Sequence, residues 1–586
     1  MNDKPKSVWT RPWQGRRKVF AWFALLAVTI FVILMCFDSD LILPALGLAL
    51  GISLLIMIAV WFIRWLCCWR NFKRFIFGLA CLVTFIALFY AVENFRGKRA
   101  WENYKRAGEA KGEKFDITSI APAPVPDDQN FAMQPIWVEE ISGMMGMEKA
   151  RTWYGDKVAA LGHTNRVRSL DLSIELYGRQ REQTNHTGNW QIAEKTDLAI
   201  WQAYYRNLAT ITNFFAVGNE PQSPATDVLL ALSKYDAAIE QLRVASKLPH
   251  AHFPLCYNDD NPAMILLPHL ASLKGCTTTL KLRASAELQS NQSDRALDDI
   301  KLMSRLQDAI RVEPFLISHL VCIAMLNIQL QPIWEGLADH KWNEAQLIAL
   351  DAELGKLDFL ATYQFAMRGE QAFSCGFIDY LRRNRSAFEN LGWNFDDLNA
   401  PPPSDFQNIL AYAIPGGWFE QNKISICQIR TGYFAQFINL QTRTYSASNV
   451  AKADEIYGKH LTNLNPYNWF SRFLSSGLQN AAKKFVQAQS STELARIAIA
   501  LERHHLAHAS YPETLDALVP QSIAKLPHDV INGQPLKYHR TETGGFILYS
   551  VGWNEKDDGG TVVMGSGKTP SVDQNQGDWV WASEAK

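Results

Sequence analysis

Three long apolar runs near the start of the sequence most constrain how this chain can fold. They extend from Val19 to Phe37, from Leu41 to Ile63 and from Phe75 to Val92, and no charged residue interrupts them. Each has roughly the 18 to 25 residues that a helix needs to cross a hydrocarbon core about 30 Å thick. We therefore predict three transmembrane helices within residues 19–92.

Two other interpretations of these runs fit the sequence less well. A cleaved signal peptide would have a shorter apolar segment and a cleavage site of small residues. Here the first run leads through Asp38 and Asp40 straight into the second run. Three buried helices of a water-soluble core would have to be apolar on every face beside basic flanks rich in tryptophan.

Lysines and arginines beside the apolar runs predict how the helices are oriented. Residues 1–18 and the loop between the second and third runs are rich in them, whereas the first loop carries two aspartates. Since basic loops stay in the cytoplasm, residues 1–18 are expected to form a cytoplasmic tail, and the large domain is expected to be extracytoplasmic. Basic residues between Arg96 and Lys111 favour the opposite orientation, but long translocated domains often ignore such charges. The expected location is the bacterial inner (cytoplasmic) membrane.

The charge balance argues against nucleic acid as a partner. Lys plus Arg and Asp plus Glu both number 58, so there is no bulk attraction to an acidic polymer. The apolar runs also lack the charged residues that mark a substrate path through a membrane. The expected partners are the lipid bilayer and other envelope proteins.

The nine cysteines do not form a disulfide framework. Four lie in or beside the apolar runs, and the others are widely spaced in the rest of the chain: Cys256, Cys276, Cys322, Cys375 and Cys427. An odd, scattered set predicts mostly buried free thiols, with one or two disulfides if the compartment is oxidising.

The rest of the chain divides into a linker, a helical region and a C-terminal module. Residues 93–135 are expected to form a charged helical stalk and a linker, since prolines alternate from Ala121 to Asp128. Residues 136–477 show helical periodicity, as from Ser293 to Arg311, where Ser293 is expected to cap the helix, and from Asn343 to Leu360. No fixed repeat period is present, so we predict an irregular, solenoid-like α-helical domain and a mainly α fold.

A different pattern begins with a long helix expected from Leu478 to Ala509. After it come, in order, Tyr511-Pro512, the turn Asn532 to Pro535, strands Leu536 to Arg540 and Phe546 to Val551, the acidic loop Gly552 to Gly560, and Asp578-Trp579. This order resembles the globular domain of the type II secretion major pseudopilin. The resemblance implies a small α+β, pseudopilin-like domain over residues 478–586. Polymerisation is not implied, because the prepilin signal and the single spine helix are missing.

The same resemblance implies a metal site. In the pseudopilin the acidic loop binds calcium through carbonyl and carboxylate oxygens, which suit a hard cation. Carried over by position, the calcium ligands would include Asn554, Asp557, Asp558 and Asp578, although Asn554 stands where the family has an aspartate. The alternative is a solvated acidic turn in which these residues stabilise the loop.

A second resemblance covers the region beyond the apolar runs. The segment Pro124 to Ala132 reads Pro-Val-Pro-Asp-Asp-Gln-Asn-Phe-Ala. It is similar to a family of membrane proteins from planctomycete and verrucomicrobial bacteria. This resemblance implies no particular activity.

Two histidine clusters resemble metal sites but lack a complete ligand set. His504 and His508 share one helix face, yet no third ligand and no His-Glu-x-x-His order accompanies them. The second cluster consists of His250, His252, Cys256, Asp259 and Asp260. We interpret the first as a polar helix face and the second as a shaped structural connection.

The sequence contains no recognisable catalytic constellation. The leading hypothesis is a membrane-anchored extracytoplasmic scaffold or protein-interaction protein in envelope assembly or secretion. The alternative is an envelope hydrolase with a pocket in the helical domain, where His250, His252, Asp259 or Glu370 would converge. Without such a pocket, Glu370 is expected to be an ion-paired structural residue.

Overall fold

The computed structural model divides the chain into two compact units, Met1–Phe95 and Arg96–Lys586. It describes residues 16–37, 42–67, 69–160, 187–211, 215–390, 412–462, 465–475, 478–565 and 571–585. Residues 1–15, which make up most of the predicted tail, lie outside the described residues.

The first unit is built from apolar helices. α1 (Arg16–Phe37) and α2 (Ile42–Leu66) pack on each other, and α3 (Trp69–Glu109) begins in this unit. Large apolar side chains of α3 are exposed, including Phe77 at 72% and Phe85 at 69%. Exposure of this kind is typical of helices that face lipid.

Three of the described helices are long and apolar enough to cross a membrane: Leu46–Leu66 within α2, α3, and α13 (Leu316–Ala338). α1 contributes a shorter apolar segment, Lys18–Ile33. In α13, however, 67% of the apolar window is buried inside the second unit, against 0% in α3. α13 is therefore a core helix.

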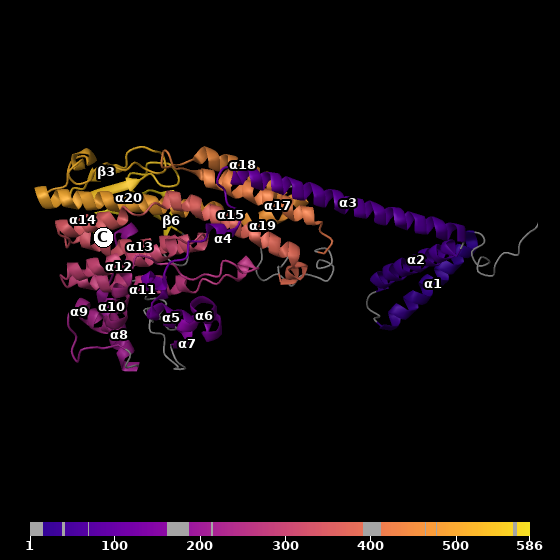
Figure 1. Cartoon of the computed structure of the whole chain (residues 1–586), viewed down its shortest axis with the longest axis horizontal. Helices are drawn as coiled ribbons and strands as arrows, with labels where there is room; N and C mark the ends of the chain where they lie inside the picture. Colours follow the sequence, from indigo (N-terminus) through magenta and orange to yellow (C-terminus); the bar gives the residue numbers. More distant parts are fainter. Residues whose placement is uncertain are drawn as a thin grey trace, which may run out of the picture. The chain divides into compact units, whose positions relative to one another are not determined.

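The second unit, here called the body, is mainly helical. α11 (His269–Gln289), α12 (Ser293–Arg311) and α13 pack on one another, and α20 (Leu478–His508) packs on α13 (Figure 1). Among its described residues the body also contains the helices α4 (Ile117–Ile120), α5 (Pro135–Met145), α6 (Met147–Tyr154), α7 (Asp156–Ala160), α8 (Leu198–Ile211), α9 (Pro224–Leu232), α10 (Asp236–Ser246), α14 (Glu344–Leu354), α15 (Phe359–Arg383), α17 (Gly416–Cys427), α18 (Ala447–Thr462) and α19 (Trp469–Ser475).

The observed bounds of α12, α14 and α15 correct two predictions about helix ends. α12 has the predicted bounds, but Ser293 does not cap it: the residue is already helical, and its hydroxyl accepts a hydrogen bond from Gln346 Nε2 at 3.1 Å. The helix expected from Asn343 to Leu360 is broken at Gly355. Asn343 and Gln346 form a capping box that starts α14, and α15 begins only at Phe359.

Short strands follow α20. β3 (Lys537–Arg540), β4 (Phe546–Ser550) and β7 (Trp579–Ala582) form an antiparallel sheet in the order β3-β4-β7, so the predicted hairpin is confirmed. β7 was not predicted. Two separate pairs complete the strands: β5 (Val562–Met564) with β6 (Val572–Gly577), and β1 (Ile438–Asn439) with β2 (Thr444–Tyr445).

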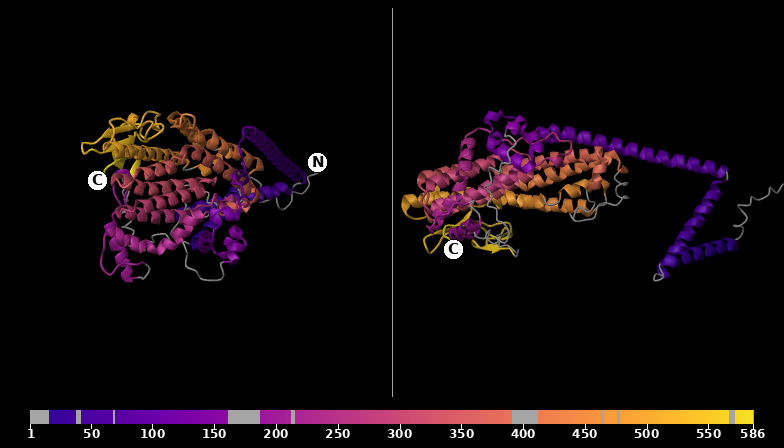
Figure 2. Two further views of the ribbon diagram at one scale, coloured as in Figure 1. Left: turned by 60° about the vertical axis from the view of Figure 1, so that its left-hand side comes forward. Right: turned by 90° about the horizontal axis from the view of Figure 1, so that it is seen from below.

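The sheet shares its core with the helices (Figures 1 and 2). Trp581 of β7 is fully buried, and its ring lies 5.1 Å from that of Trp190, centroid to centroid. The indole N–H of Trp334 in α13 donates to the carbonyl of Ala582. Residues 136–477 and 478–586 therefore lie in one compact unit.

A buried charge cluster lies among α10, α11 and α12. Arg283 pairs with Glu287 at 3.2 Å and with Asp299 at 3.6 Å, and all three side chains are at most 4% exposed. Arg243 also pairs with Asp299, and Arg295 with Glu287. Burial is the main cause that raises the pKa of Glu287 to about 8 and that of Asp299 to about 6.

Candidate metal centre

Three of the residues predicted to bind calcium, Asn554, Asp557 and Asp558, lie in the loop after β4, and the fourth, Asp578, lies between β6 and β7 and contacts this loop. Asn554 Nδ2 donates to Asp558 Oδ2 at 2.8 Å, and the backbone N–H of Asp558 donates to Asp578 Oδ1 at 3.3 Å. Asp557 accepts from the Tyr549 hydroxyl and pairs with Lys537. The structure thus brings Asn554, Asp557, Asp558 and Asp578 into one neighbourhood.

Asp578 organises this loop. Its carboxylate is buried and also accepts from the backbone N–H groups of Gly560 at 2.7 Å and Thr561 at 3.3 Å. Burial raises the pKa of Asp578, whereas the Tyr549 hydroxyl lowers the pKa of the exposed Asp557. These bonds fix the shape of the loop, and calcium binding stays a prediction.

The cluster around His250 and His252 fastens the linker to the body. Asn130 Nδ2 donates to the carbonyl of His252 at 2.8 Å, and the backbone N–H of His252 donates back to Asn130 Oδ1 at 2.9 Å. The carbonyl of His250 accepts from the backbone N–H of Phe131 at 2.8 Å. These backbone contacts give the loop a structural role.

The acids near these histidines have separate partners. Asp259 accepts from the backbone N–H of Asn261, and Asp260 pairs with Arg383 at 3.6 Å. Glu370 of α15 pairs with Arg430 at 3.0 Å and accepts from the backbone N–H of Leu316. The prediction that Glu370 is an ion-paired structural residue is confirmed.

His504 and His508 lie on an exposed face near the end of α20, and their rings stack with centroids 4.1 Å apart. His504 Nδ1 lies 3.0 Å from the carbonyl oxygen of Ser510, and His508 Nδ1 lies 3.0 Å from that of His504. One nitrogen of each ring is therefore already engaged with backbone.

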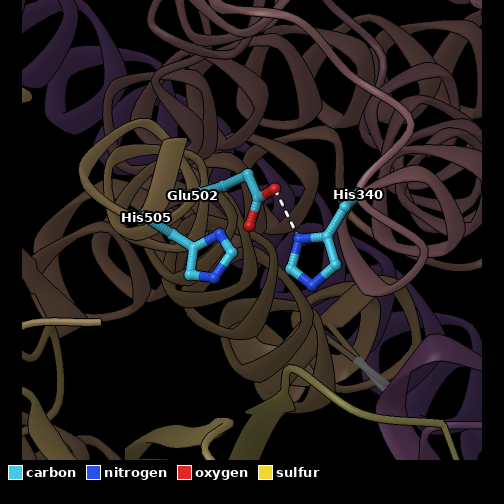
Figure 3. A group of neighbouring side chains, drawn as sticks. All are labelled: His340, Glu502 and His505. Carbon is cyan, nitrogen blue, oxygen red and sulfur yellow. Dashed lines mark hydrogen bonds and ion pairs between the residues drawn. The ribbon is translucent and has the colours of Figure 1, made fainter. Parts of the chain in front are cut away.

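A different histidine of the same helix takes part in a three-residue cluster. His340, Glu502 and His505 each offer one ligand atom, and these atoms all lie within 4.8 Å of one another. Figure 3 shows the three side chains pointing toward a common centre. In the part of the chain that the structure describes, no other three His, Cys, Asp or Glu residues approach this closely.

Glu502 is buried and contacts both His340 and Tyr511. Its side chain is 2% exposed, and one carboxylate oxygen lies 2.7 Å from His340 Nδ1. The other oxygen accepts from the Tyr511 hydroxyl at 2.9 Å. Burial and this acidic neighbour raise the pKa of Tyr511, so its proton stays available for the bond.

His505 completes the cluster. Its ring stacks on those of His340, at 4.7 Å between centroids, and Tyr511, at 4.8 Å. Its Nδ1 is buried and has no hydrogen-bond partner in the structure. Leaving a buried polar atom unpaired costs about 1–3 kcal/mol.

The backbone at His340 is unusual. The end of α13 is a Schellman turn, in which the N–H of Lys341 donates to the carbonyl of Gly336 and the N–H of His340 to that of Leu337. His340 adopts φ 50° at the position where glycine is the usual residue. A side chain in this left-handed region costs about 1–2 kcal/mol.

Two imidazoles and a carboxylate form a donor set that suits a zinc-class ion. The sequence contained one signal for it, since Glu502 and His505 stand three positions apart and so share a helix face. His340 carried no signal, because only the packing of α13 against α20 brings it to the other two.

No family model, curated protein or solved structure matches this chain. The fold and the site together define a mainly α-helical protein with helices long and apolar enough to cross a membrane.

Proposed function

We propose that this chain is a membrane-anchored scaffold whose body presents surfaces to other proteins of the bacterial envelope, in envelope assembly or secretion. One observation carries the proposal. The residues that a catalytic pocket in the helical domain would have used, namely His250, His252, Asp259 and Glu370, have separate structural contacts. The backbone groups of His250 and His252 hold the linker, Asp259 accepts from the backbone N–H of Asn261, and Glu370 pairs with Arg430. These contacts hold elements of the body together, which supports a structural role for this region.

The architecture supports a rigid body of this kind. The C-terminal sheet is built into the helical core through Trp190, Trp334 and Trp581. A surface that has to bind partners in one geometry gains affinity when its own elements are fixed beforehand.

The module after α20 is proposed to be pseudopilin-like. The order of a long helix, the β3-β4 hairpin and an acidic loop organised by Asp578 supports this view. α20 packs on α13, α14 and α15 instead of extending as a free spine. We infer that such a module would act within this body and not as a filament subunit.

Partner capture in membranes tests the proposal. The tagged full chain and a matched control that ends after Lys111, which keeps all the predicted spans, are each treated with a lysine cross-linker and purified. The full chain is expected to retain a defined set of envelope proteins that the control does not retain. Recovery of the same set with both, or of none with either, would contradict a scaffold role.

A further inference from the structure

We propose that His340, Glu502 and His505 bind a divalent transition-metal ion of the zinc class, which ties the end of α13 to the end of α20. This inference goes beyond the scaffold function and does not depend on it. It rests on the geometry of three side chains from two separate parts of the chain.

The donor atoms are already gathered. A zinc ion lies about 2.0–2.2 Å from imidazole nitrogen and carboxylate oxygen, so its ligand atoms stand roughly 3–3.5 Å apart. The three ligand atoms lie within 4.8 Å of one another, and the closest pair, His340 Nδ1 and Glu502 Oε1, is 2.7 Å apart. An ion would require the side chains to adjust, and the His340 side chain, at 48% exposure, lies at the surface.

The surroundings of the cluster also fit a metal site. Ligand carboxylates in proteins are usually fixed by an outer hydrogen bond, and the Tyr511 hydroxyl supplies one to Glu502 Oε2. The remaining oxygen, Oε1, is the one that faces His340.

Two features are left unexplained by a simple His340–Glu502 ion pair. The pair gives no partner to the buried Nδ1 of His505, which an ion would satisfy. It also gives no reason for His340 to occupy a left-handed position that glycine would fill without strain. A metal ligand at this position accounts for both.

The neighbouring pair His504 and His508 is the competing site on the same helix. It consists of two stacked imidazoles, of half-buried His504 and exposed His508, whose Nδ1 atoms already face carbonyl oxygens, and the close three-residue group does not include either of them. The pair therefore provides a matched control, with the same residue type on the same helix but outside the proposed site.

Metal titration of the purified full chain tests the proposal. The detergent-solubilised protein is stripped with a chelator and titrated with Co²⁺ while the visible absorption of the bound ion is recorded, and Zn²⁺ is then used to displace it. We expect one tight ion per chain in the wild type and in the His504→Ala/His508→Ala variant. We expect at least a roughly tenfold weaker affinity in Tyr511→Phe, which loses only the outer hydrogen bond, and no tight site in His505→Ala.

His340→Gly separates loss of the metal from loss of the fold. Glycine relieves the left-handed backbone but removes the imidazole partner of the buried Glu502 carboxylate, so this variant is expected to melt lower than the wild type in chelator while keeping a cooperative transition. Zn²⁺ should raise the melting temperature of the wild type and leave that of His340→Gly unchanged. Equal binding by the wild type, His340→Gly and His505→Ala, or loss of binding in the His504→Ala/His508→Ala variant alone, would overturn the proposal.

Discussion

The indole N–H of Trp334 donates a hydrogen bond to the carbonyl oxygen of Ala582 across 2.8 Å. This bond joins a central helix of the body, α13, to the strand β7. Trp581, the neighbour of Ala582, is fully buried, and its ring contacts that of Trp190 at a tilt. The helices and the C-terminal sheet are therefore expected to unfold together.

Replacement of Trp581 by alanine tests this coupling. Loss of a fully buried tryptophan removes its contacts and leaves a cavity, which costs about 3–5 kcal/mol of unfolding free energy. Trp334→Phe keeps an aromatic ring and loses the hydrogen bond, so about 1 kcal/mol is expected. Chemical denaturation of the detergent-solubilised chain, followed by circular dichroism, measures both. Trp469→Phe, at a site 39% exposed, is the control with little change. A separate early transition for the sheet would contradict the shared core.

The buried carboxylate Glu287 is expected to make stability depend on pH. Burial raises its pKa from the ordinary 4.5 to about 8, and the groups facing it are Arg243, Arg283, Arg295 and Asp299. A raised pKa in the folded state means that stability is greatest below about pH 4.5 and falls as the pH rises through about 8. Glu287→Gln cannot ionise, so the melting temperature of this variant relative to wild type should increase from pH 5 to pH 8. A constant difference over that range would show that Glu287 does not titrate there.

The redox state of two buried thiols, Cys375 and Cys427, is expected to show whether the body lies inside or outside the cytoplasm. Cys375 and Cys427 lie with their sulfur atoms 3.6 Å apart, close to Trp101, Tyr104 and Phe115. If the body lies outside the cytoplasm, we expect this pair to be joined as a disulfide, because an oxidising compartment forms bonds between cysteines this close. Cells are alkylated before lysis, and peptides are mapped by mass spectrometry without reduction. Cys276 and Cys322 are buried controls that should stay as thiols. A fully reduced Cys375–Cys427 pair would favour a cytoplasmic body.

Calcium binding by the loop around Asp578 has a direct thermal test. Millimolar calcium should raise the melting temperature of the full chain, since a ligand that binds only the folded state stabilises it. Asp558→Asn should reduce the shift, because it removes a charge without touching the bonds through which Asp578 holds the loop. Magnesium serves as the ionic-strength control. An identical increase in melting temperature with magnesium, or no increase with calcium, would contradict a calcium site in this loop.

Local patterns in the sequence predicted the elements that depend on local physics. The apolar periodicity of α12 set its bounds, and turn residues placed the β3-β4 hairpin. The cap at Ser293 was wrong because the hydroxyl pairs with Gln346 of another helix, a choice that tertiary packing makes. β7 was missed because a strand of four residues carries too little sequence pattern to be predicted without knowledge of its pairing partner, β4.

The candidate metal centre could not be assembled from the sequence for the same reason. Glu502 and His505 are neighbours on α20, but His340 reaches them through the Schellman turn that ends α13. Of the histidines on α20, His504 and His508 have the more familiar metal-ligand spacing of four residues, but they lie outside the three-residue cluster. Which of these side chains faces another element depends on packing, which periodicity alone does not specify.

The pairing of α13 with β7 also has a consequence during biosynthesis. A ribosome makes Trp190 and Trp334 well before Trp581, so a nascent chain carries these rings without their partner. Exposed apolar surface in incomplete chains promotes aggregation. The growing protein is therefore expected to need a chaperone until β7 is made, and premature termination between Trp334 and Trp579 should yield a product that quality-control proteases remove.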